Sequence, residues 1–114
     1  MNISPYAWPG MPDSLRSAIT TDQIIDAVCA YYNVERDLLS QANRSRKVVV
    51  ARHVIWHLMR RFMKKAYLTD MGRMFRKDHT TVIHGLRSIA NDIETDSKVM
   101  RDVETIAARI KNRA

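Results

Sequence analysis

The chain has 114 residues, of which 46% are hydrophobic, and it carries a formal net charge of +7. This length and composition are typical of one globular domain with a single modest core, which needs neither metals nor disulfides to fold. The one cysteine, Cys29, excludes an internal disulfide, the longest apolar run is too short and too polar to span a membrane, and no secretory signal is recognisable, so we expect a cytoplasmic protein.

The N-terminal residues 1–19 contain all three prolines and show no sustained hydrophobic period. This pattern predicts an irregular arm ahead of a folded domain over residues 20–114. The domain opens with a capping box, in which Thr20 caps a helix and Gln23 reaches back. Apolar residues then follow at helical spacing, and Asn33 is the expected end of this helix because asparagine tolerates the left-handed conformation.

The middle of the chain predicts a short helix over residues 35–39, a polar loop over 40–45 and a long helix over 46–66. The long helix has an apolar side and a separate basic side, the latter formed by Arg52, Arg60 and Lys64.

Three helices are predicted in the remainder, over residues 68–75, 78–93 and 96–112. The helix over 78–93 has apolar residues at 82, 86, 89 and 93, which lie on one side at about 100° per residue. No segment shows the alternation of a strand, so the fold class is all-α.

The stretch RKDHTTVIHG, Arg76 to Gly85, forms the start of that helix. Asp78 stands where an N-cap belongs and can accept from the backbone N–H of Thr80 or Thr81. On the side of the helix opposite the apolar residues lie Thr80, His84, Arg87 and Asn91, while His79 and Thr81 project from the first turn. Two helices joined by a tight turn, the second with an exposed polar N-terminus, are typical of a helix-turn-helix.

The positive charge is concentrated in the same region. Between Arg44 and Arg87 there are twelve lysines and arginines against two acids, a local charge of +10, whereas the rest has seven against ten, a charge of −3. Such an excess indicates a surface for a polyanion, and we favour nucleic acid over an anionic membrane.

The run KDHTTVIHG, preceded by Met71-Gly72 and Phe75, resembles the signature of the C-terminal, origin-box-binding domain of the bacterial replication initiator DnaA. The segments upstream of this run also occur in the order that the family shows, namely Ile24…Val28…Tyr32, Asp37-Leu38-Leu39 and Arg44-Ser45-Arg46. The resemblance covers roughly residues 22–112. It implies a six-helix bundle that contains a helix-turn-helix, similar to the Trp repressor.

The resemblance also implies DNA contacts at matching positions. Arg44 would reach into the minor groove, Arg52 and Arg60 would hold phosphates, and Asp78, His79 and Thr80 would meet base edges. Thr81 would pack on a thymine methyl or a phosphate. The expected DNA-binding set is completed by Arg46, Lys47, Lys77, His84 and Arg87.

Three features depart from the family pattern. The turn after Phe75 is one residue shorter and lacks its glycine, and the loop before Arg44 is one residue longer. No GxxxxGK[ST] phosphate loop occurs in the sequence, so we expect no nucleotide cofactor and no ATP-driven melting of an origin.

Catalysis and metal binding are less favoured. His79 with Thr80 or Thr81 could act as base and nucleophile, but the cap Asp78 is the only nearby carboxylate and no oxyanion-hole element is present. The i, i+4 pair His53 and His57 has no acidic or cysteine partner for a metal. We therefore expect neither an enzyme nor a cofactor. In the helix of this histidine pair we expect Trp56 to be a core residue. In the helix over 78–93 we expect Gly85 to permit close packing against a neighbouring helix.

The leading hypothesis is sequence-specific binding of double-stranded DNA at DnaA-box-like sites, in the regulation of replication initiation or of transcription. It places the protein in the cytoplasm, associated with the nucleoid. The alternative is a protein-interaction module that binds the full-length initiator or another replication factor. In that case the N-terminal arm, with Tyr6 and Trp8, would be the docking peptide.

Overall fold

The computed structural model describes residues 19–42, 45–63 and 66–113. In these residues the chain forms five α-helices and one 3-10 helix and no strand, which confirms the expected all-α fold with six helical segments. In chain order the elements are α1 (Thr21–Tyr32), η2 (Arg36–Ser40), α2 (Arg46–Phe62), α3 (Leu68–Arg73), α4 (His79–Thr95) and α5 (Ser97–Arg113).

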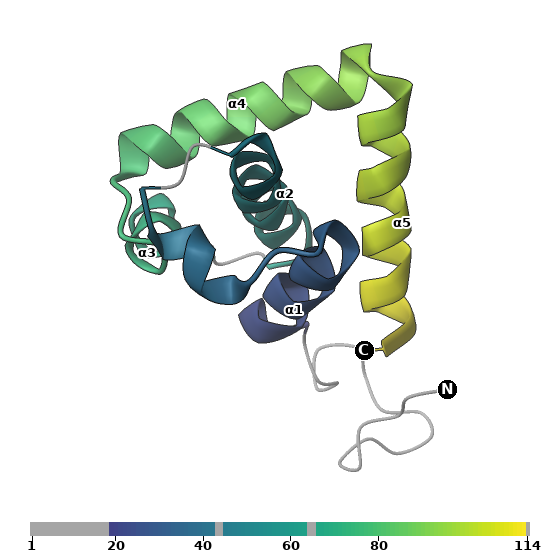
Figure 1. The fold of residues 1–114 in the computed structure, drawn as a ribbon, viewed down its shortest axis with the longest axis horizontal. Helices are drawn as coiled ribbons and strands as arrows, with labels where there is room; N and C mark the ends of the chain where they lie inside the picture. The colour runs from purple at the N-terminus through teal and green to yellow at the C-terminus, as the bar shows by residue number, and fades with distance from the viewer. Residues whose placement is uncertain (1–18, 43–44, 64–65, 114) are drawn as a thin grey trace.

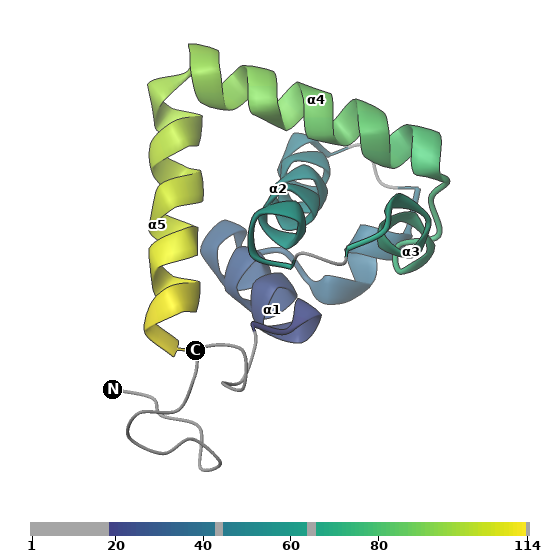
Figure 2. The same cartoon turned by 180° about the vertical axis from the view of Figure 1, so that it is seen from behind.

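Helix α2 is the centre of the fold. It packs against α1, η2 and α4, while α5 packs against α1 and α4. Figures 1 and 2 show α4 and α5 as two adjoining edges around α2, with α1 on the side of α2 away from α4. The α2 side chains that are fully buried form the middle of the core, and they are Ala51, Val54, Ile55, Trp56 and Leu58.

Helix α1 has the ends that the sequence predicts. The Thr20 hydroxyl accepts from the backbone N–H of Gln23 at 3.2 Å, and Gln23 Oε1 accepts from the backbone N–H of Thr20 at 2.9 Å. At the other end, Asn33 has a φ of 54°, and the N–H of Val34 donates to the Cys29 carbonyl at 3.0 Å. Both ends are local motifs, so they confirm the capping box and the predicted stop.

Helix α2 ends at Phe62, four residues before the predicted end at residue 66, and that prediction is wrong. Met63 is extended, with φ −117° and ψ 101°. Its sulfur accepts from the Thr21 hydroxyl at 3.6 Å, and its side chain packs partly against the core. The end of the helix therefore coincides with a contact between Met63 and α1, and no breaker residue in the local sequence indicates this end. The other boundaries agree within two residues.

Arg52 does not lie on an exposed basic side of α2, which corrects the prediction for this residue. It is 6% exposed, and its Nε donates to the Leu39 carbonyl at 3.0 Å. Arg52 follows Val48 by four residues and precedes Ile55 by three, so helical geometry places it on the buried side of α2. The guanidinium joins the end of η2 to α2 and supplies a donor that the η2 carbonyls need.

Candidate nucleic-acid interface

The N-terminus of α4 is held by its capping residue. Asp78 Oδ1 accepts from the backbone N–H of Thr81 at 2.8 Å and from the Thr81 hydroxyl at 3.0 Å, which confirms the predicted N-cap. These hydrogen bonds, the backbone one foremost, hold the pKa of Asp78 below its ordinary value. The first turn of α4 therefore presents its side chains in one geometry.

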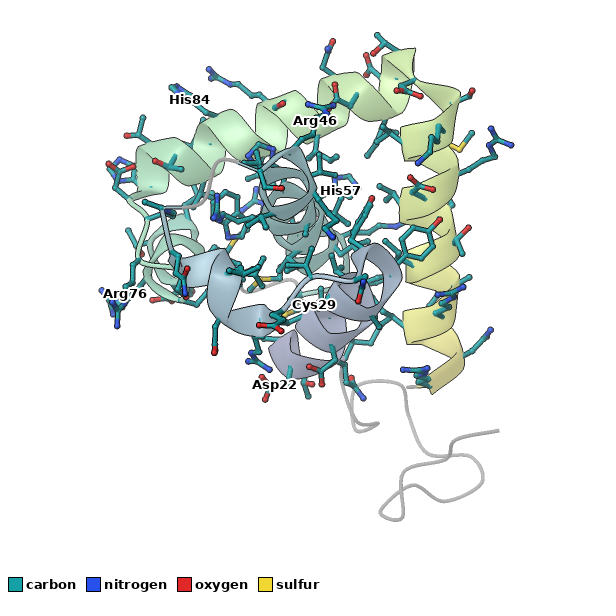
Figure 3. The ribbon with its side chains drawn as sticks, viewed as in Figure 1. Asp22, Cys29, Arg46, His57, Arg76 and His84 are labelled. Atoms are coloured by element: carbon teal, nitrogen blue, oxygen red, sulfur yellow. The ribbon has the colours of Figure 1, made fainter. Side chains whose placement is uncertain are left out.

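The polar front of α4 is open to solvent, as the sequence predicts. Its exposed members are His79, Thr80, Thr81, His84 and Arg87, whereas Val82, Gly85 and Ile89 are buried on the other side. Figure 3 shows His84 on the outer side of α4, pointing away from the other helices. A helix of this kind can lay its first turns against a partner without disturbing the core.

The turn between α3 and α4 adopts a Schellman motif although it lacks the family's glycine. Arg76 has a φ of 58° and its N–H donates to the Arg73 carbonyl at 3.1 Å. The N–H of Lys77 donates to the Gly72 carbonyl at 2.8 Å. A methyl group at Gly72 would lie 2.4 Å from the Lys77 carbonyl oxygen, so only glycine permits this close approach. Arg76 thus takes the left-handed position that glycine usually fills.

The buried side of α4 rests on α2 at Gly85. A methyl group there would lie 2.7 Å from His53 Cδ2 and 2.9 Å from Cε3 and Cζ3 of Trp56. The imidazole of His53 stacks on the indole of Trp56 with ring centroids 6.0 Å apart. This confirms both the close packing expected of Gly85 and the core position expected of Trp56. Burial lowers the pKa of His53, and the charge of Arg52 lowers it further.

Ion pairing separates the cations of the fold into two groups. Arg36 pairs with Asp22 at 2.6 Å, Arg61 with Glu104 at 2.8 Å and Lys98 with Asp102 at 2.9 Å. By contrast, five cations around α4 and the start of α2 form no hydrogen bond or ion pair through their side chains with any other described residue, and they are Arg46, Lys47, Arg76, Lys77 and Arg87. Figure 3 shows Arg46 next to α4 and Arg76 in the turn before it.

The other arginines predicted to contact DNA differ in their surroundings. Arg60 is exposed near the end of α2 and its Nη1 lies 3.4 Å from the Ala66 carbonyl oxygen, a weak hydrogen bond. Arg52 is bound within the core. Arg44, and with it the predicted minor-groove contact, lies outside the described residues, as do Tyr6 and Trp8 of the N-terminal arm.

Two residues near the helix-turn-helix were not singled out from the sequence. Arg76 was seen only as a change in the turn, yet it supplies an exposed cation there. Tyr67 is the residue before α3 and is 63% exposed, more than any other large hydrophobic residue in the described part of the chain. An aromatic residue directly before the first helix of a helix-turn-helix is the signal that could have identified it.

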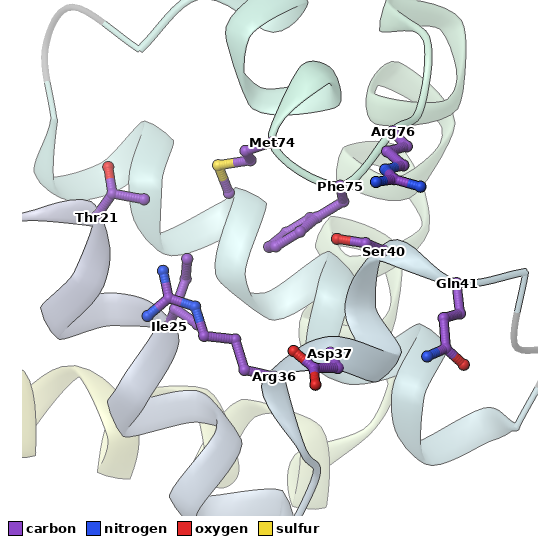
Figure 4. Close-up of a pocket in the computed structure, with 9 residues that line it drawn as sticks. All are labelled: Thr21, Ile25, Arg36, Asp37, Ser40, Gln41, Met74, Phe75 and Arg76. Atoms are coloured by element: carbon purple, nitrogen blue, oxygen red, sulfur yellow. The ribbon is translucent and has the colours of Figure 1, made fainter.

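A pocket of about 480 Å³ opens between α1, η2 and the α3–α4 turn. Figure 4 shows its lining, which combines apolar side chains with charged and polar ones: Thr21, Ile25, Arg36, Asp37, Ser40, Gln41, Met74, Phe75 and Arg76. None of the residues predicted to contact DNA lines it. The guanidinium of Arg36, one of its charged lining groups, is paired with Asp22.

Among the residues that the structure describes, no three His, Cys, Asp or Glu side chains come together as they would around a metal ion. His53 and His57 are both partly buried on α2, and burial lowers the pKa of each. No helix of the described chain is long and apolar enough to cross a membrane.

Comparison with known proteins agrees with this geometry. The family model described as the bacterial dnaA protein helix-turn-helix matches residues 21–89, from the start of α1 to the buried Ile89 of α4. Similar proteins include the chromosomal replication initiator protein DnaA of Chloroflexus aggregans, which is 38% identical over 97 residues. Those of Roseiflexus castenholzii and Caldanaerobacter subterraneus are 35% identical over 100 residues and 30% identical over 111 residues.

These alignments cover 84%, 87% and 97% of this chain, but only 20%, 21% and 25% of the respective relatives. The chain therefore spans about a fifth to a quarter of the length of the curated relatives that it matches.

Proposed function

The chain belongs to the bacterial DnaA helix-turn-helix family, and from this premise we propose that it reads DnaA-box-like sites in double-stranded DNA. Membership makes it a DNA-binding helix-turn-helix protein related to replication initiation, and this domain of the family is not a catalytic one. Recognition of a particular sequence, and the residues that read it, are the proposal.

The observation that carries the proposal is the capped, exposed first turn of α4 above a closely packed back. The recognition helix of a helix-turn-helix enters the major groove with its N-terminal residues on base edges. His79 and Thr80 are short, exposed and correctly placed for this task. Threonine can donate, accept or pack its methyl on a thymine methyl, so both residues suit direct reading of bases. Asp78 and Thr81 complete this first turn, and His84 lies one turn further along the exposed front.

Phosphate binding is supported by the cations around α4 and the start of α2 that form no ion pair with another described residue. Arg46 and Lys47 begin α2, Lys77 lies in the turn and Arg87 lies on the exposed front of α4. A cation already bound to a carboxylate would have to break that pair to reach a phosphate, whereas these four form no ion pair with another residue of the described ranges. We propose that Arg60 adds a phosphate contact and that Arg44 enters the minor groove.

Arg52 has a different proposed role from the one that family resemblance implies. Its guanidinium donates to the carbonyls of Leu39 and Gln41, at 3.0 Å and 3.4 Å. It therefore anchors the segment that leads into the basic loop before α2. Arg52 would affect DNA binding through the position of that loop rather than through a phosphate contact of its own.

The test is a titration of the protein against a duplex with a DnaA box and a scrambled duplex of equal composition. We expect the box to bind about a thousandfold or more tightly at physiological salt. Thr80→Ala should weaken binding to the box by about 1–3 kcal/mol and leave the scrambled duplex nearly unchanged.

The matched control is Thr105→Ala, which removes an exposed threonine from α5, away from α4. It should change neither affinity. Equal affinity of the unaltered protein for both duplexes would refute box reading. Equal weakening of binding to both duplexes by Thr80→Ala would contradict the proposal that α4 enters the major groove.

We also propose that the protein acts in regulation by occupying boxes that the full-length initiator would use. Footprinting of a box-containing duplex with both proteins tests this proposal. A footprint of the initiator that shrinks as this protein is added supports competition, whereas two footprints that persist together contradict it.

A further inference from the structure

Trp56 of α2 contacts both helices of the helix-turn-helix. It is fully buried, and its Nε1 donates to the Met71 carbonyl of α3 at 2.9 Å. The six-membered part of its indole lies directly beneath Gly85 of α4, where an added methyl would come within 2.9 Å. Its ring also lies 6.1 Å from the Phe75 ring, centroid to centroid, at the turn between the two helices.

The hydrogen bond to Met71 completes the end of a very short helix. The last carbonyls of any helix lack donors from within it, and a buried one needs a partner from elsewhere. In α3 the Asp70 carbonyl accepts from Met74, and the Gly72 carbonyl accepts from Phe75 and Lys77. For the Met71 carbonyl, the indole N–H is the only donor outside α3 among the described residues.

The contacts of Trp56 hold both helices of the motif in place. The hydrogen bond sets the position of the end of α3, while contact of the flat ring with Gly85 sets the distance of α4 from α2. The imidazole of His53, stacked on the same indole, closes the other side of the contact with Gly85.

We propose that Trp56 is a positioning residue for DNA reading, which holds α3 and α4 at the separation that lets bases and phosphates be contacted together. This inference rests on the proposed function. Sites of this kind must be held within about 0.5 Å by supporting residues to work. Non-specific binding needs only cations near phosphates and tolerates a shifted helix. Loss of the Trp56 contact should therefore affect discrimination more than general affinity.

The experiment compares Trp56→Phe with Tyr31→Phe. Each variant removes one hydrogen bond that an aromatic side chain donates, and the Tyr31 hydroxyl donates to Asp102 of α5 at 2.6 Å, away from the helix-turn-helix. Both variants are titrated against the box and scrambled duplexes at a temperature at which thermal unfolding shows them fully folded. We expect Trp56→Phe to lower the ratio of the two affinities about tenfold, the effect of roughly one mismatched base pair. Tyr31→Phe should leave the ratio unchanged.

A second measurement does not depend on DNA. Amide hydrogen exchange in the free protein should accelerate at Phe75 and Lys77 in Trp56→Phe, relative to the slowest-exchanging amides of α2, and not in Tyr31→Phe. Equal exchange in both variants, or an unchanged affinity ratio in Trp56→Phe, would overturn the proposal. If the unaltered protein itself shows no preference for the box, the proposed function fails, and the exchange measurement still decides whether Trp56 holds the turn.

Should Trp56→Phe not fold, Gly85→Ala replaces it, because the added methyl displaces α4 from the indole while the hydrogen bond to Met71 is kept. The same fall in the affinity ratio is expected, and an unchanged ratio in this variant would equally overturn the proposal.

Discussion

At the helix-turn-helix, single residues affect the stability of the fold through their backbone conformation and burial as well as through their charge. Arg76 holds a φ of 58°, where its Cβ crowds the backbone, and the hydrogen bonds of the turn keep it there. Two partly buried imidazoles, those of His53 and His57, lie on α2, the first against Gly85 of α4 and the second near Glu104 of α5. Stability should therefore depend on the backbone conformation at Arg76 and on the protonation of the two histidines, and substitutions can test both.

Arg76→Gly should stabilise the protein by about 0.5–1 kcal/mol, because glycine adopts the left-handed conformation without a Cβ clash. The free energy of unfolding by urea measures this change. Arg76→Ala is the control, since it removes the charge and keeps the Cβ. Stabilisation by both variants alike would show that charge repulsion, and not backbone conformation, is the source.

The stability of the protein should fall as the pH is lowered below about 6.5, the ordinary pKa of histidine. Burial first, and then the charges of Arg52 and Arg61 respectively, lower the pKa of His53 and His57 in the folded state. Between the folded and unfolded pKa values the unfolded chain binds more protons, so stability is present above this window and is lost as the pH falls through it.

Thermal unfolding at about pH 7.5, 6.5 and 5.5 tests this sign. The double variant His53→Gln, His57→Gln should show a flatter dependence over the same range. The acids with lowered pKa values, Asp78, Asp102 and Glu104, act only near pH 4 and below, outside this range. A melting temperature that rises towards pH 5.5 in the unaltered protein would contradict the assignment.

At the scale of elements, α4 can lie close to α2 because Gly85 has no side chain. Gly85 in a helix interior costs about 1 kcal/mol relative to alanine. It is nevertheless the residue that lets α4 approach the rings of His53 and Trp56. The short α3 depends in the same way on Gly72, where the turn backbone passes. The two glycines let the helices of the motif pack closely on the core and on each other.

Gly85→Ala should destabilise the protein by about 1–2 kcal/mol, since overpacking outweighs the gain in helix propensity. Ser88→Ala, at an exposed position of the same helix, provides the control and should change stability by less than about 0.5 kcal/mol. Urea unfolding of both variants measures the difference. A Gly85→Ala variant as stable as the Ser88→Ala variant would show that α4 can move away from α2 at little cost.

For the whole molecule, charge is distributed unevenly. Among the described residues, Arg46, Lys47, Arg76, Lys77 and Arg87 lie around α4 and the start of α2 without an ion pair, while α1 and η2 expose three acids, of which Arg36 pairs with the first two: Asp22, Asp26 and Asp37. A polyanion would attract the first of these two sets of residues and repel the second, which favours one orientation during encounter. This arrangement also explains why the local charge of the central segment is more informative than the net charge of the chain.

Arg60→Ala should reduce the slope of log K against log salt by about one, equally for box and scrambled duplexes, since one fewer counterion is released. Its neighbour Arg61 is the matched control, because both of its outer nitrogens bind the Glu104 carboxylate, at 2.8 Å and 3.2 Å. Arg61→Ala should leave the slope nearly unchanged and lower stability by less than about 1 kcal/mol. A larger change of slope for Arg61→Ala would reverse the two assignments.

The sequence by itself determined the helical segments, the ends of α1, the cap of α4 and the polar front behind that cap. Each depends on residues within about five positions of one another, so the pattern can be recognised before the chain is folded. The family could be identified for the same reason, because the signature from Asp78 to Val82 is contiguous. The DNA contacts assigned to these residues remain predictions.

Only the tertiary structure decided which polar groups the fold itself binds. Arg52 bonds carbonyls 13 and 11 residues earlier, Trp56 a carbonyl 15 residues later, and Arg61 a carboxylate 43 residues later. At the end of α2, Met63 meets Thr21, which lies 42 residues earlier. A helical pattern specifies the side of a helix on which a residue lies, but not which distant group meets it. The spacing of Arg52 from Val48 and Ile55 thus agrees with its burial, but only the fold shows which carbonyls its guanidinium binds, whereas Arg60 is exposed to solvent.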